Sequence, residues 1–293
     1  MIYHFIKTEL NNYPVWLCCK VLGVNRAGYY HWQKRKVIQR ALEEKRILEL
    51  IRKHHNLSKG RYGLLRIHKA ICREGLIVNK KRIHRLMKKY NIHSKTRRKF
   101  KVTTKQSTGA MFSENLLNGI FQTKRENEVW TSDITYIWTK ESWLYLAVVQ
   151  DIFNREEIGW AIMERPTAEI VQKAIAMAIT NRKPERDIIF HSDRGSQYTS
   201  KKVRGILDHY GFRQSMSGKG NCYDNAITET FFSTLKKELV YLTVFETKEQ
   251  AKREIFEFIE IYYNRQRLHS SLGYLSPVEY GMKMREEFKS KVA

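Results

Sequence analysis

Three acidic side chains have the residue types and the spacing expected of a site for divalent metal ions. Asp133 and Asp193 lie 60 positions apart, and Glu229 follows 36 positions later. Carboxylate oxygens are the ligands that hard divalent cations take in proteins. Two such ions can hold the attacking and the leaving oxygen of a phosphodiester displacement. The three acids therefore predict metal-assisted phosphoryl transfer on a nucleic acid, with two ions of Mg²⁺ or Mn²⁺ as the cofactor.

The segments around these acids carry more information than the spacing, because 30 of the 293 residues are Asp or Glu and chance will match many spacings. Asp193 lies in HSDRGSQY, and Glu229 lies in SGKGNCYDNAITETFFSTLKKE. Two further segments, VLGVNRAGYYHW and YNRQRLHSSLGYLSPVEY, lie near the two ends of the chain. Over nearly the whole chain, these segments resemble the DDE transposases, specifically the catalytic second-reading-frame protein of IS-three-family bacterial insertion sequences.

The resemblance implies an integrase catalytic core in which Asp133, Asp193 and Glu229 are the catalytic residues and metal ligands. It also implies cleavage at the 3′ ends of an element, joining through a circular intermediate, and insertion into target DNA. The expected partners are duplex DNA (the terminal inverted repeats and the target), further copies of the chain on paired ends, and the upstream-frame protein as a fusion or partner. Two alternatives stay open: a nuclease that cuts without joining, and a DNA-binding regulator or domesticated transposase without strand-transfer activity.

The acids are expected to stand on a ribonuclease-H-like α/β core over residues 126–245. Near Glu128 the apolar pattern changes from a helical to an alternating period, and three strands precede an alternation of helices and strands. This order predicts a mixed five-stranded sheet with flanking helices. The expected strands are Val129–Trp138, Trp143–Val149, Glu157–Met163, Ile188–Phe190 and Phe212–Ser217, and the expected helices are Thr167–Thr180 and Ser200–Tyr210. Functional groups gather at the carboxyl ends of strands in such sheets, and Asp193 follows the fourth strand.

The first strand alternates in a way that assigns a face to Asp133. Its even positions are mainly apolar and include Trp130, Ile134, Tyr136 and Trp138. Successive side chains of a strand point to opposite faces. We therefore expect Asp133 to point away from the packed side of the sheet.

Glu229 lies on a predicted helix that ends near Glu238. The residues spaced four apart on its expected buried face are Ile227, Phe231 and Leu235. Glu229, Ser233 and Lys236 form a second stripe on the opposite side. We expect Lys236 to grip a substrate phosphate two turns from the metal-binding carboxylate; the alternative is an ordinary solvent stripe. Before the helix, we expect Asp224 or Asn225 as its cap and a loop at Gly218 and Gly220 that moves or admits DNA.

The positive charge of the chain is concentrated in its first third. Residues 1–100 hold 26 Lys and Arg against 5 Asp and Glu, whereas residues 101–293 hold 28 against 25. Such clustering is typical of a protein that binds a polyanion. Predicted helices at about 64–73 and 79–90 flank a tight turn, which is consistent with helix-turn-helix. The second helix carries the expected DNA contacts Lys80, Lys81, Arg82, Arg85, Lys88 and Lys89. They would read bases from the major groove or only grip phosphates.

The remaining features set the domain boundaries. We expect a short basic helical segment over 1–40, a basic all-α HTH-like region over 41–100, a linker over 101–125 and a C-terminal helical extension over 246–293. In the extension, Arg265, Arg267 and His269 either contact DNA or pack onto the core, and packing is favoured. The four cysteines form no CxxC pair, and no apolar run has the roughly 18 residues of a membrane span. A cytoplasmic, nucleoid-associated protein with no membrane partner is therefore expected.

Overall fold

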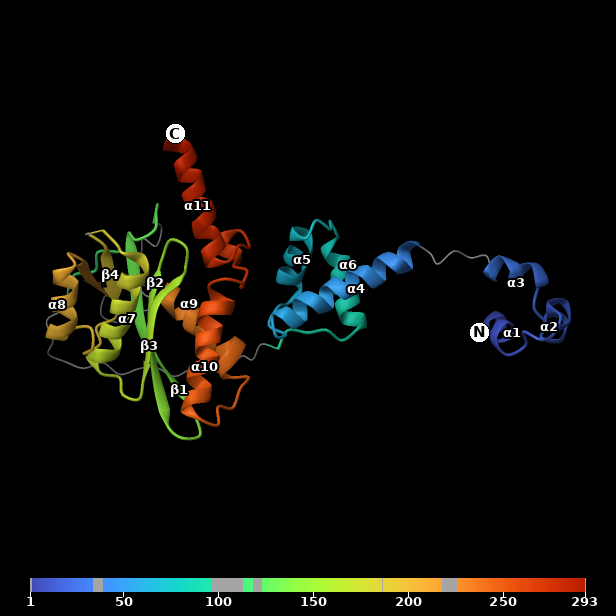
Figure 1. Ribbon diagram of the computed structural model, residues 1–293, viewed down its shortest axis with the longest axis horizontal. Coiled ribbons are helices and arrows are strands. Elements are labelled where there is room, and N and C mark those ends of the chain that lie inside the picture. Colours follow the sequence, from blue (N-terminus) through green and yellow to red (C-terminus); the bar gives the residue numbers. More distant parts are fainter. Residues whose placement is uncertain are drawn as a thin grey trace.

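The computed structural model describes residues 2–33, 39–95, 113–117, 123–185, 187–217 and 226–292. Most of the predicted linker, the loop glycines Gly218 and Gly220, and both proposed caps, Asp224 and Asn225, lie outside these residues. Figure 1 shows three successive parts along the described chain: small N-terminal helices, a second helical group, and a sheet with helices on both sides.

The third part contains the mixed five-stranded sheet that was expected. Its strands are β1 (Val129–Trp138), β2 (Trp143–Asp151), β3 (Glu157–Met163), β4 (Ile189–Ser192) and β5 (Arg213–Met216). They lie in the order β3-β2-β1-β4-β5. Strands β1, β2 and β3 pair antiparallel, while β1 with β4 and β4 with β5 pair parallel. The apolar patterns thus located all five strands to within a few residues.

Helices cover both faces of this sheet (Figure 1). On one face, α7 (Ala168–Arg182) and α8 (Lys201–His209) pack on Trp130, Ala147 and Val149. The other face is covered by α9 (Ala226–Leu235) and α10 (Lys248–Phe256). Helix α7 approaches β3 so closely that a Cβ atom on Gly159 would lie 2.2 Å from the carbonyl oxygen of Ala174. Only glycine fits that contact.

The two-sided cover corrects the face assigned to Asp133. Its neighbours on the same face of β1, Thr131 and Thr135, are only 1% and 4% exposed, so this face is packed. On the other face, Tyr136 and Trp138 are about half exposed. The expectation was wrong because α9, which comes after all five strands in the sequence, packs on the face of β1 that carries Asp133. The hydropathy pattern of one strand does not show which distant helix will cover it.

The second helical group is built as a helix-turn-helix. Its helices are α4 (Gln39–Leu57), α5 (Leu64–Arg73) and α6 (Lys80–Lys89). Asn79 caps α6 by accepting a hydrogen bond of 2.8 Å from the backbone N–H of Lys81. Gly75 makes the turn between α5 and α6 with a φ of 87°, where a side chain would be strained. Buried Ile51, Ile67 and Ile83 hold the three helices together.

The N-terminal helices form a small core of their own. Helices α1 (Ile2–Thr8), α2 (Val15–Val21) and α3 (Arg26–Gln33) surround the buried residues Ile6, Cys18, Cys19 and Tyr29. Asn25 accepts a 2.8 Å hydrogen bond from the N–H of Ala27 and so caps α3. The first helix was not predicted from the sequence.

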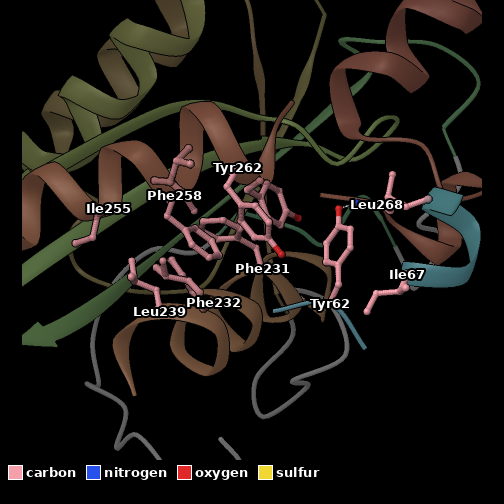
Figure 2. Close-up of a cluster of buried hydrophobic side chains, with 14 of the residues drawn as sticks. Tyr62, Ile67, Phe231, Phe232, Leu239, Ile255, Phe258, Tyr262 and Leu268 are labelled. Atoms are coloured by element: carbon pink, nitrogen blue, oxygen red, sulfur yellow. Dashed lines mark hydrogen bonds between the residues drawn. The ribbon is translucent and has the colours of Figure 1, made fainter. Parts of the chain in front are cut away.

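The helix-turn-helix group shares one hydrophobic core with the sheet-covering helices (Figure 2). Tyr62 stacks obliquely on Tyr262, with ring centroids 6.4 Å apart. Its hydroxyl donates to the carbonyl oxygen of Gln266 at 2.7 Å and accepts from the N–H of Leu268 at 3.0 Å. These bonds satisfy the hydroxyl where it is buried. The basic helices and the sheet domain are therefore packed against each other and are not merely tethered.

Two π-helical segments extend the helices of the sheet domain. Segment η2 (Lys236–Val240) continues α9, and η3 (Glu257–Tyr263) continues α10, so the second of these helices extends to Tyr263. A short 3₁₀ turn, η4 (Ser270–Leu272), then leads to α11 (Pro277–Val292). Within the part of the chain that the structure describes, no helix is both long and apolar enough to cross a membrane.

Candidate active site

The register of two parallel strands places the first two acids side by side. Ser132 of β1 lies opposite Ser192 of β4, so the next residues along the two strands are Asp133 and Asp193. Neighbouring strands lie about 4.8 Å apart. The two carboxylates therefore stand together at the carboxyl end of β4, although 60 positions separate them in the sequence.

Asp193 also makes the turn that follows β4. Its Oδ1 atom accepts a hydrogen bond of 3.0 Å from the backbone N–H of Gly195. The loss of surrounding water raises the pKa of the Asp193 carboxyl, and this hydrogen bond partly offsets the rise. Asp193 can both make this turn and bind a metal ion, because the hydrogen bond uses one of its two carboxylate oxygens.

Buried hydroxyl groups support the strands directly beneath the two acids. Ser132 donates to the carbonyl oxygen of Val148 at 2.7 Å and lies 2.9 Å from the hydroxyl of Tyr198. Fully buried His191 lies 2.9 Å from Ser215 through its Nδ1 atom. The polar residues that flank Asp193 in HSDRGSQY are thus largely structural. Sequence reasoning assigned no role to Ser132 or Tyr198, and the only signal available was their position near Asp133 and Asp193 in the chain.

Helix α9 is attached to β1 next to the acids. Thr228 donates a 2.8 Å hydrogen bond to Thr131, and both side chains are buried. The expected apolar face is confirmed at Phe231 and Leu235, which are fully buried. The side chain of Ile227 lies outside the described residues. Glu229 follows Thr228 directly, so the buried threonine pair brings the third acid to the edge of the same site.

Asp133 is the electrostatic centre of the group. Burial raises its pKa to about 7, the negative charges of Asp193 and Glu229 add to the rise, and Lys236 opposes it. Burial also raises the pKa of Glu229. A carboxyl that ionises only near neutrality, beside two further acids, is a site where a divalent cation would relieve charge repulsion.

The acids are near one another without forming a closed cage. Among the described residues, no group of three or more His, Cys, Asp or Glu side chains is close enough together to hold a metal ion. The charge of each of the other two acids acts on Asp133, while Glu229 is exposed on the first turns of α9. The geometry therefore groups the three carboxylates at one site but leaves Glu229 at its rim.

Lys236 directly follows α9 and lies beside Tyr136 of β1. Its Nζ atom stands 4.9 Å from the centroid of the Tyr136 ring, a favourable cation–π distance. Burial lowers the pKa of the ammonium group, and Asp133 opposes that effect. Lys237, one residue later, is exposed. The π-helical geometry begins only at Lys236, so the chain from Glu229 up to that residue is α-helical. Glu229 and Lys236 therefore lie two turns apart on the same side of the helix.

A buried carboxylate in the same π-helical turn was missed by sequence reasoning. Glu238 is 5% exposed and accepts a 2.9 Å hydrogen bond from Arg267 and another of 2.9 Å from the Tyr262 hydroxyl. Arg66 of α5 reaches the same carboxylate at 3.3 Å. Burial alone raises the pKa of Glu238, but the charge and hydrogen bonds of Arg267 and its neighbours outweigh burial and lower it. This group connects α5, η2 and the C-terminal segment.

Two of the three C-terminal basic residues pack onto the core, as was favoured from the sequence. Arg267 and His269 are each 7% exposed and belong to the buried group, while Arg265 is exposed. The neutral ring of His269 lies 3.2 Å from the Arg267 guanidinium. Burial and the Arg267 charge lower the pKa of His269 to about 2. Packing is therefore confirmed for these two residues.

The six basic residues expected on α6 also divide into two groups. Arg82 pairs with Glu43 at 3.0 Å and Arg85 pairs with Glu44 at 2.7 Å, so both brace α6 against α4. The other four are exposed, and we refer to them as the α6 lysines: Lys80, Lys81, Lys88 and Lys89. Arg85 keeps 54% of its side chain exposed in its pair, so the exposed charge on this helix is carried mainly by the lysines, which bind phosphates as point charges.

Family models match most of the chain that carries this site. An integrase core domain matches residues 123–222, a second integrase core domain matches residues 229–284, and an HTH-like domain matches residues 42–100. Asp133 and Asp193 lie in the first core match, and Glu229 opens the second.

Named transposases align with the chain over nearly their full lengths. The chain is 37% identical over 282 residues to transposase InsF for insertion sequence IS3A of Escherichia coli strain K12, covering 96% of this chain and 98% of that protein. It is 41% identical over 247 residues to the transposase for insertion sequence element IS904 of Lactococcus lactis, covering 84% and 97%. The chain belongs to the IS3-family transposases.

Two further similarities accompany this family assignment. An insertion element IS600 protein of 31 kDa from Shigella sonnei is 40% identical over 262 residues, covering 89% of this chain and 96% of that protein. Among solved structures, a chain of the simian T-cell lymphotropic virus intasome in complex with PP2A regulatory subunit B56 gamma aligns at 14% identity with a TM-score of 0.44, covering 78% of this chain and 73% of that chain. The family models and the named transposases confirm the expected DNA transposase/integrase activity, the integrase core and the HTH-like region.

Proposed function

We propose that Asp133, Asp193 and Glu229 are the catalytic metal ligands of this transposase, and that it cleaves and joins DNA at the ends of an insertion sequence. The observation that supports this most strongly is the β1–β4 register, which sets Asp133 beside Asp193, with α9 presenting Glu229 at the same site. Three carboxylates from three elements are a donor set that fits Mg²⁺ or Mn²⁺.

The reaction requires no covalent bond between the protein and DNA. The oxygen of a water molecule or of a 3′ hydroxyl attacks phosphorus, and the bond from phosphorus to the leaving oxygen breaks. Divalent ions held by the three acids, two in our proposal, supply activation of the attacking oxygen and charge neutralisation at the leaving oxygen. Asp133 would hold an ion in its ionised form, and a bound cation would favour that form because burial and the neighbouring acids raise the pKa of the free carboxyl to about 7. Lys236 binds a non-bridging phosphate oxygen and holds the strand at the acids.

The substrates follow from the same proposal. The α6 lysines bind the phosphates of duplex DNA, and the site at Asp133 receives first the terminal inverted repeats and then target DNA. Two ends must be handled together in such a reaction, so we propose a homo-oligomer on paired ends, with the upstream-frame protein as a fusion or partner.

Variants of the acids test the assignment with two readouts. Asp133→Asn, Asp193→Asn and Glu229→Gln should each abolish Mg²⁺-dependent cleavage of DNA carrying the element ends. Each should also reduce the rise in unfolding temperature that millimolar Mn²⁺ gives to the wild type, because a ligand that binds only the folded state stabilises it. Glu126→Gln, an acid of the same domain that pairs with Arg182, serves as the control. A variant with wild-type cleavage and a wild-type response to Mn²⁺ removes that residue from the site.

The nuclease alternative is separated by the products. A transposase releases shorter strands and also joins a labelled 3′ end to a second DNA molecule, whereas a nuclease yields only the shorter strands. Joined products that depend on all three acids support the proposal, and cleavage without any joining under the same conditions contradicts it.

A further inference from the structure

A patch of exposed aromatic rings lies next to the candidate active site. It consists of Tyr136, Trp138 and Trp143, which are 48%, 54% and 44% exposed, and we call it the aromatic patch. Trp138 lies directly opposite Trp143 in the β1–β2 register, so the rings stand on one face of the hairpin. The centroid of Trp143 is 5.3 Å from that of Tyr136 and 4.9 Å from that of Trp138. The three rings are therefore continuous.

The patch begins at the cation of the site. The Lys236 ammonium group lies 4.9 Å from the centroid of Tyr136 and also acts on Asp133 electrostatically. A phosphate held by Lys236 would therefore have its neighbouring nucleotides beside Tyr136. From there the rings continue along the hairpin, away from the acids.

The size of the patch argues against a protein partner. Three aromatic side chains that are about half exposed offer on the order of 300 Å² of surface. A stable protein interface takes about 800 Å² from each partner. An aromatic surface this small, with a cation at one end, matches the stacking platforms on which proteins bind unpaired nucleotides.

We propose that the aromatic patch binds unpaired bases at a DNA end, by stacking on Trp138, Trp143 and Tyr136, while Lys236 holds the adjoining phosphate. The inference rests on the proposed function only in taking DNA as the substrate. Because every base has a π-face, the patch would bind unpaired bases of any sequence and would bind separated strands in preference to paired ones. It would favour frayed or newly cut ends over intact duplex at the acids.

The test compares a blunt duplex with the same duplex carrying a six-thymidine 3′ tail, both in EDTA. Without divalent ions no cleavage occurs, so the outcome is independent of whether the three acids are the metal ligands. The full-length wild type should bind the tailed duplex more tightly. Trp138→Ala with Trp143→Ala should weaken binding of the tailed duplex roughly 5- to 150-fold for each base that no longer stacks, and should leave the blunt duplex unchanged.

Two controls keep the result interpretable. Trp16→Ala removes a tryptophan that is also 54% exposed, in α2, and should leave the preference for the tail intact. Trp138→Phe keeps a stacking ring and should retain most of the preference. If the double variant does not fold, the single variants Trp138→Ala and Trp143→Ala take its place, and each should weaken binding of the tailed duplex. A 2-aminopurine base in the tail should lose fluorescence with the wild type and regain it with the double variant.

Three results would overturn the proposal. The first is a double variant that binds the tailed duplex as tightly as the wild type does. The second is an equal loss of binding for the blunt and the tailed duplex. The third is a wild-type dimer in sedimentation that becomes monomeric in the double variant while the tail preference stays unchanged, since the patch would then be a contact between copies of the chain.

Discussion

Removing the buried charge of Glu238 should destabilise this transposase far more than removing an exposed one. The substitution Glu238→Gln leaves the Arg267 guanidinium, whose side chain is 8% exposed, without its counter-ion. Removing one partner of a buried pair costs about 3–5 kcal/mol. We expect the lower end, about 3 kcal/mol, because glutamine still accepts from Tyr262 and the second arginine, Arg66, is 25% exposed. That destabilisation corresponds to a fall in Tm of roughly 6–12 °C.

The assay is thermal unfolding at pH 7 of the wild type and two variants. The matched control is Glu246→Gln, because Glu246 pairs with Lys140 where both side chains are about 60% exposed. An exposed pair of this kind contributes at most about 1 kcal/mol. If Glu238→Gln lowers Tm no more than Glu246→Gln does, the buried ion pair does not stabilise the fold as proposed.

A second substitution distinguishes an unpaired charge from weaker packing. Replacing Arg267 with Met in the Glu238→Gln background removes the uncompensated cation, and buried pairs replaced by apolar groups are often neutral or better. The double variant should therefore recover part of the stability that Glu238→Gln removes. A double variant as unstable as the sum of the two single variants would show that the charges do not interact.

Three further predictions concern single features of the chain. Lys236→Ala should reduce strand transfer at least about tenfold with Tm nearly unchanged. Lys237→Ala should have little effect, because the exposed Lys237 side chain leaves the helix in a different direction. Equal reductions in a strand-transfer assay would contradict a directed contact. Replacing all four α6 lysines with Gln should reduce the magnitude of the slope of log K against log salt concentration by up to about 3.6 for duplex DNA. An unchanged slope in a titration series would exclude the four lysines as phosphate contacts. Because the folded pKa of His269 is about 2, the unfolded chain alone takes up its proton below about pH 6.5. The stability that neutral His269 contributes is therefore complete above that pH and is lost as the pH falls. The difference in unfolding free energy between the wild type and His269→Gln, measured by urea unfolding, should shrink by about 2 kcal/mol between pH 7.5 and pH 5. A difference that stays constant over this range would contradict the prediction.

Periodicity and local chemistry were enough to place most elements of this protein. The strand Trp143–Asp151 is apolar throughout most of its length because both of its faces are covered, and that run is visible without the structure. The caps Asn25 and Asn79 act within a few residues of themselves, so their roles are local as well. The three acids lie in distinctive segments, which made them candidates before any geometry was known. Hydrophobic patterns and helix caps depend on residues that are close together in the sequence, so the sequence alone is enough to predict them.

Tertiary structure decided which groups meet. The face of Asp133 depends on α9, which lies almost a hundred residues further along the chain and covers the strand from that side. Arg82 and Arg85 were predicted to contact DNA, but α4 supplies a glutamate to each. Glu238 looked like one more charged residue on a helix, but Arg267 and Arg66 close around it. Whether a charge is free, paired or buried depends on groups brought in from distant segments, and in a chain with 54 basic and 30 acidic side chains very many pairings are possible. Only the packed fold selects among them, because burial makes one pairing far stronger than its alternatives at the surface.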